Sequence, residues 1–124
     1  MVLPREDDER LREWRALLRE GRAVLLGAVR QEILSGVRTE QQYWRLHGAL
    51  REYADEPTTP EDYEEAARCF NRCRGSGIQG SSTDFLICAV ALRLGAAIFT
   101  SDGDFALYAR HLPLQLHEPR TAAS

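Results

Sequence analysis

Two kinds of apolar pattern alternate along this chain, a helical spacing and short continuous runs. Residues 6–20 have helical spacing with acids in the first turn, and Gly21 follows them. The next seven residues, 23–29, are almost wholly apolar, which is typical of a strand buried on both faces of a parallel sheet. The first thirty residues therefore predict a helix followed by a buried strand.

The same alternation continues to the end of the chain. Helical spacing returns at 30–36, at 37–50 and at 61–74, and a short edge strand is an option at the break in residues 57–60. After a glycine-rich loop at 75–80, the run at 85–94 is apolar on all sides and ends before Gly95, so we expect a buried helix there. Residues 96–100 and 114–117 predict two more strands, separated by a brief helix at 105–108.

This order of elements predicts an α/β domain of three layers with a mostly parallel sheet. A length of 124 residues fits a single domain spanning 1–124, with tails at 1–4 and 119–124. Cys69, Cys73 and Cys88 follow no metal-ligand or disulfide spacing and should be small buried side chains. No apolar stretch is long enough for a signal peptide or a membrane span, so we expect a cytoplasmic protein with no membrane partner.

The charge of the chain limits how it could bind nucleic acid. Its formal net charge is −3, and all 16 basic residues are arginines. A polyanion would be repelled by the whole-protein field, so any contact must come from local arginines. Arg30, Arg72 and Arg74 are candidates for phosphate contacts, although solvated charges that offset a helix dipole explain them equally well.

Four acidic residues occupy three sites that follow predicted strands or begin helices. Glu32 follows the first apolar run, Asp84 lies at the start of the buried helix, and Asp102 and Asp104 follow the run at 96–100. Each has a local explanation: a dipole partner for Glu32, a capping box with Ser81 for Asp84, and a turn for the last two. Taken together, these acids could meet at one edge of a sheet, where clustered carboxylates need a cation. Hard oxygen ligands favour Mg²⁺ or Mn²⁺, and such ions support phosphodiester hydrolysis.

Three segments carry a family resemblance: Arg-Gln-Glu-Ile-Leu-Ser-Gly at 30–36, Ser-Thr-Asp-Phe-Leu-Ile-Cys-Ala-Val-Ala-Leu at 82–92 and Ile-Phe-Thr-Ser-Asp-Gly-Asp-Phe at 98–105. They resemble consecutive motifs of PIN-domain ribonucleases of the VapC toxin type, in the family's order. The resemblance implies Mg²⁺-dependent RNA cleavage, inhibition by a cognate antitoxin protein, and a homodimer. It implies Glu32, Asp84 and Asp102 as catalytic and metal-binding acids, Asp104 as a further metal ligand, and Thr83 and Thr100 as polar supports.

The N-terminus departs from the family pattern. The family begins with a central strand ending in Asp-Thr/Ser-Ser and a short helix, and the matching part of this chain starts after both. We therefore expect the first acid of the cluster to be absent, since Asp7 and Asp8 belong to a charged helix start. Two neighbouring strands would then close up, pair with another chain, or be completed by residues encoded upstream. The alternative function is an inactive PIN remnant that binds an antitoxin or an intact homologue.

Overall fold

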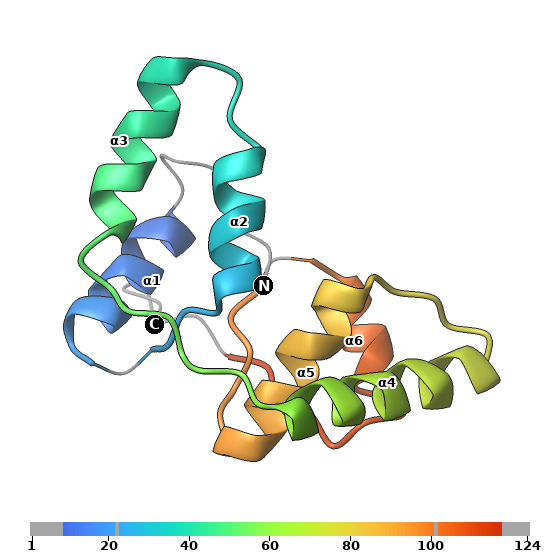
Figure 1. Ribbon diagram of the computed structural model, residues 1–124. Helices are drawn as coiled ribbons and strands as arrows, with labels where there is room; N and C mark the ends of the chain where they lie inside the picture. The colour runs from blue at the N-terminus through green and yellow to red at the C-terminus, as the bar shows by residue number, and fades with distance from the viewer. Residues whose placement is uncertain (1–8, 22, 101, 118–124) are drawn as a thin grey trace.

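The computed structural model describes residues 9–21, 23–100 and 102–117. Six helices make up its regular structure, and Figure 1 shows them in two groups. We call α1, α2 and α3 the N-terminal lobe and α4, α5 and α6 the C-terminal lobe. The predicted tails at 1–4 and 119–124 lie outside the described residues, as do Asp7 and Asp8.

The N-terminal lobe contains α1 (Glu9–Arg19), α2 (Gly27–Ser35) and α3 (Glu40–Leu50). The predicted helix at the start of the chain is confirmed for residues 9–19. Thr39 caps α3, because its side chain accepts a hydrogen bond from the Gln42 amide. The guanidinium of Arg30 fastens α2 to the end of α3: it donates to the Leu50 carbonyl at 2.9 Å and to the carbonyl of Tyr53, and it pairs with Asp55 at 2.8 Å.

The C-terminal lobe contains α4 (Pro60–Gly75), α5 (Ser82–Leu94) and α6 (Asp104–Tyr108). Thr59 and Asp62 form a capping box at the start of α4, where Pro60 occupies the first helical turn. Asp62 is also buried, and the Arg93 guanidinium of α5 donates to it at 2.8 Å. The prediction of a buried helix at 85–94 is confirmed: residues 85–90 are all buried, and Gly95 ends α5 at a φ of 63°.

The predicted parallel sheet and three-layer α/β architecture are wrong. The described residues form no strand, only two isolated parallel bridges, Leu25 with Asp55 and Ile98 with Leu116. The apolar run at 23–29 is not a strand because its second half, from Gly27 onward, belongs to α2. The segments at 96–100 and 114–117 are extended, but each meets a partner at one residue pair only. The option of an edge strand at 57–60 fails too, since α4 begins at Pro60.

The core consists of one apolar cluster to which both lobes contribute. Trp14, Leu25 and Val29 are its most buried members in the N-terminal lobe, and Phe85, Cys88 and Tyr108 are among those in the C-terminal lobe. Cys69, Cys73 and Cys88 are buried free thiols, as predicted. Over the described ranges, no helix is both long enough and apolar enough to span a membrane.

Candidate active site

Asp84 lies in the first turn of α5, and the loop before the helix determines its position. Its amide donates to the Ser81 hydroxyl at 3.1 Å, which is half of the capping box predicted from the sequence. The other half does not form, because the Asp84 carboxylate instead accepts a hydrogen bond from the hydroxyl of Tyr108 at 2.7 Å. The side chain of Asp84 is therefore available to a site between α5 and α6.

Tyr108 is the centre of this site. Its ring is fully buried and contacts the rings of Phe85 and Phe105, with centroid distances of 4.8 and 5.2 Å. A Cβ on Gly80 would come within 2.3 Å of the Tyr108 hydroxyl oxygen, so glycine is needed for this close approach. Burial raises the pKa of Tyr108 far above its usual value, and the hydrogen bond to Asp84 raises it further. Tyr108 thus remains a protonated hydrogen-bond donor.

Asp102 and Asp104 lie in the turn that leads into α6, the helix of Tyr108. Their negative charges also raise the pKa of Tyr108, less than burial and Asp84 do. The Asp102 amide donates to the Thr100 hydroxyl at 2.9 Å, and the Asp102 carboxylate accepts from the Asp104 amide at 2.9 Å. These two local hydrogen bonds hold the backbone of the turn at Asp102 and Asp104. We call Asp84, Asp102, Asp104 and Tyr108 the aspartate corner.

The PIN domain family matches residues 1–111, which is most of the chain. The chain belongs to the PIN domain family. PIN domains are generally nucleases, and they typically use divalent metal ions. The aspartate corner of this PIN domain contains three of the four acids predicted from the sequence, and carboxylates are the ligands that a hard cation prefers.

Glu32, the fourth predicted acid of this PIN domain, is not part of the corner. It is exposed on α2, in the N-terminal lobe, and its carboxylate forms no hydrogen bond or ion pair with another residue in the described ranges. No group of three His, Cys, Asp or Glu side chains in the described part of the chain is arranged to hold a metal ion. The acids present have suitable chemistry, but their arrangement does not form a metal site.

The predicted polar and basic residues have different surroundings in this PIN domain. Thr100 supports the Asp102 turn as described above, and Thr83 lies half-buried beside Asp84. Arg72 and Arg74 are exposed at the end of α4, and the Arg74 guanidinium lies 5.4 Å from the ring centre of Phe70. Arg30 has three protein partners inside the N-terminal lobe, so its guanidinium supports the fold of that lobe.

A groove of about 560 Å³ begins beside the aspartate corner. Ser82 and Thr83 of α5 lie on its wall next to Asp84, and Tyr63 and Phe70 of α4 contribute aromatic rings. Tyr63 is 57% exposed, so its ring is accessible from solvent. We call this space the aromatic groove.

Sequence reasoning missed Tyr108 and Gly80. A tyrosine in a short amphipathic helix looks like an ordinary core residue, and a glycine in a Gly/Ser-rich loop looks like a turn residue. One feature of the sequence could have indicated Tyr108. The apolar pattern predicts that this residue is buried, and a buried tyrosine hydroxyl needs a hydrogen-bond partner.

Proposed function

We propose that this PIN domain is an endoribonuclease of the toxin type, acting with Mg²⁺ or Mn²⁺ and controlled by a cognate antitoxin protein. The observation that supports it best is the aspartate corner at the end of the aromatic groove. Carboxylates at such a position can neutralise and hold a hard cation, and exposed aromatic rings can stack on the bases of single-stranded RNA. Arg72 and Arg74 lie on the same helix as Tyr63 and Phe70 and would contact phosphates.

In this proposal the residues of the corner have separate tasks. Asp84 and Asp102 would be the cation ligands, and Asp104 an additional one, after a rearrangement of these side chains, because the described residues do not form a metal site as they stand. Tyr108 is a positioning residue, because its hydroxyl fixes one oxygen of Asp84 and leaves the other available. Thr100 holds the backbone of the Asp102 turn, and Thr83 would be a polar support beside Asp84. Glu32 would join the set only if the N-terminal lobe moved toward the corner.

The test is cleavage of single-stranded RNA labelled at both ends, with Mg²⁺, with Mn²⁺ and with EDTA. We expect cleavage that needs the cation and that falls by roughly two orders of magnitude or more in Asp84→Asn and in Asp102→Asn. Asparagine keeps an acceptor for Tyr108, so the fold is preserved. The matched control is Glu64→Gln, which removes an exposed carboxylate of α4 outside the corner. Metal-dependent cleavage that survives both aspartate substitutions would overturn the assignment.

The toxin role needs a separate measurement. Induced expression of the wild-type chain should arrest bacterial growth, and Asp84→Asn should not. Arrest by both proteins alike would contradict a role that depends on RNA cleavage.

A further inference from the structure

Two polar side chains beside Phe70 in the aromatic groove hold each other in place. Asn71 and Arg74 lie one turn apart on α4, and the Arg74 guanidinium donates to the side-chain oxygen of Asn71, Oδ1, at 3.2 Å. The same guanidinium lies 5.4 Å from the ring centre of Phe70. Phe70 and Asn71 both line the groove. Two contacts therefore fix Arg74, and Arg74 in turn orients Asn71.

The hydrogen bond from Arg74 determines what the Asn71 amide can offer a ligand. A guanidinium has N–H donors and no acceptor, so the amide atom that faces Arg74 must be the oxygen. The amino nitrogen of Asn71, Nδ2, then carries N–H groups that form no hydrogen bond with any described residue. Arg74 has several N–H groups, so it can bond to Asn71 and still contact a phosphate. Beside Phe70, the groove therefore presents hydrogen-bond donors.

The rest of the groove suits flat rings. Tyr63 and Phe70 are seven positions apart on α4, which places them about 10.5 Å apart along the helix axis. Phe70 is held by an edge contact with Phe85, at a centroid distance of 5.6 Å. Between the two rings, Ala66 and Ala67 line the groove with small side chains. The space above these alanines can therefore take stacked groups such as nucleobases.

The donors of Asn71 distinguish between the bases. An asparagine recognises adenine with both atoms of its amide, because adenine presents an acceptor, N7, beside a donor, its N6 amino group. The oxygen of Asn71 is already bonded to Arg74, so this amide cannot recognise adenine in that way. Guanine presents two acceptors, N7 and O6, on the same edge. Cytosine presents an amino donor there and uracil a single acceptor, so guanine matches the donors best.

We propose that the aromatic groove binds single-stranded RNA with a guanine beside Asn71, which selects this base by donating to its N7 and O6 edge. This inference rests on the proposed function, because it names the RNA that the groove would bring to the aspartate corner. Asn71 is the specificity-determining residue, and Arg74 is a positioning residue that keeps Oδ1 turned away from the base. Stacking on Tyr63 and Phe70 contributes affinity for any base, and the Asn71 amide adds the preference for guanine.

The test measures the binding of short fluorescent RNAs to the whole chain in EDTA, so that metal-dependent cleavage does not occur. Each RNA is a run of cytidines with one variable base at its centre: guanine, hypoxanthine, 7-deazaguanine or adenine. Hypoxanthine keeps both N7 and O6, whereas 7-deazaguanine lacks N7. We expect fluorescence anisotropy to give equal affinities for guanine and hypoxanthine, a roughly tenfold lower affinity for adenine, and an intermediate affinity for 7-deazaguanine.

Three variants assign the preference to individual side chains, all of them exposed on α4. Asn71→Ala should lower the ratio of guanine to adenine affinity to about one, because the selecting amide is gone. Arg74→Met frees Oδ1 of Asn71, so adenine should gain affinity relative to guanine. The control, Arg68→Gln, removes one positive charge from α4 outside the groove, as Arg74→Met does inside it, and should leave the ratio unchanged. Circular dichroism checks that all three variants fold.

The outcomes separate this inference from the proposed nuclease activity. Equal binding of the four RNAs, an unchanged base ratio in Asn71→Ala, or no binding of any RNA by the folded wild-type chain would each overturn the inference. A guanine preference in a chain that cleaves no RNA would contradict the catalytic part of the proposed function and support the inference. Metal-dependent cleavage by a chain that binds all four RNAs alike would overturn the inference alone.

Discussion

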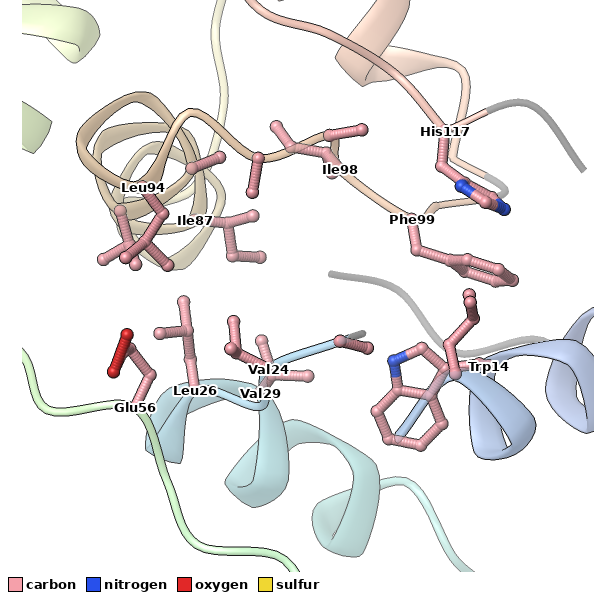
Figure 2. A pocket seen from close by; sticks show the side chains of 16 residues that line it. Trp14, Val24, Leu26, Val29, Glu56, Ile87, Leu94, Ile98, Phe99 and His117 are labelled. Carbon is pink, nitrogen blue, oxygen red and sulfur yellow. The ribbon is translucent and has the colours of Figure 1, made fainter. Parts of the chain in front are cut away.

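The two sides of α5 differ in how completely they are packed. One side meets α4 and α6, where Phe85 contacts Phe70 and Tyr108 and where Asp84 has a partner. The other side lines a groove of about 430 Å³ between the two lobes (Figure 2). Val24, Ala97 and Phe99 line this groove and have no backbone hydrogen bond to any described residue. The packed side joins segments that are near in sequence, whereas the walls of the groove lie about 70 residues apart along the chain. Contacts between segments that are near in sequence therefore form around the aspartate corner. The segments that are far apart in sequence do not pair with each other across the groove.

The largest expected difference is in the free energy of unfolding, when one buried side chain is shortened on each side of α5. Phe85→Ala should lower the free energy of unfolding by about 3–5 kcal/mol, because it leaves an enclosed cavity between aromatic rings. Val90→Ala should cost only about 1–2 kcal/mol, because it removes two methyl groups instead of a ring. Urea unfolding of both variants measures the two losses. Equal losses would contradict the tight ring packing around Phe85.

The next largest effect on stability should come from Gly80, which lies close against Tyr108. Gly80→Ala should destabilise the chain by about 1–3 kcal/mol, because the new methyl group would clash with Tyr108 and Phe85. Tyr108→Phe removes the atom that is nearest to it, so the double variant should lose less than the sum of the single variants. Strict additivity in a double-mutant cycle would show that Tyr108 does not lie against Gly80.

The aspartate corner could be predicted from the sequence only in part. Asp84, Asp102 and Asp104 were chosen from the motif order, which places them at the start of α5 and after residue 98, and their role as metal ligands stays a prediction. The prediction for Asp84 was right in one part only. The Ser81 hydroxyl caps its amide as expected, but the spacing from Ser81 could not show that the carboxylate would bond to Tyr108. Glu32 was grouped with them on the expectation of a common sheet edge, and without that sheet it lies in the other lobe.

The helices could be predicted and the sheet could not, for a physical reason. Helical spacing and caps are local, as Gly95 and the run before it demonstrate. A strand exists only if a distant segment pairs with it, and an apolar run such as 23–29 contains no information about whether that partner is present. Gly27 begins a helix there because the next residues continue the apolar face of α2.

Acid should weaken the packed side through Asp62. The hydrogen bond from Arg93 holds the pKa of Asp62 below its usual value, against the opposing effect of burial, and the Thr59 backbone lowers it further. A depressed folded-state pKa contributes stability that is present above about pH 4 and is lost as the pH falls through the folded value. We expect Arg93→Gln to flatten this loss between pH 5 and about pH 2, in unfolding curves at each pH. The same acid dependence in Arg93→Gln and the wild type would contradict the assigned cause.

The last prediction concerns the reactivity of the three thiols and involves no change in stability. Burial raises the pKa of Cys88 to about 12 and also raises the pKa values of Cys69 and Cys73. Thiolate is the reactive form, so all three should resist a thiol reagent at neutral pH while the chain is folded and react together in denaturant. Rapid modification of Cys88 in the folded chain would show that the packed side opens.

The exchange of individual backbone amides with solvent, measured by NMR, tests the contrast between the two sides most directly. The amides of Glu56, Ile98 and His117 donate hydrogen bonds in the structure, so they should exchange slowly. The amides of Val24, Ala97 and Phe99 form no hydrogen bond to any described residue, so they should exchange fast. Equal protection of both sets would contradict the unpaired backbone along the groove between the lobes.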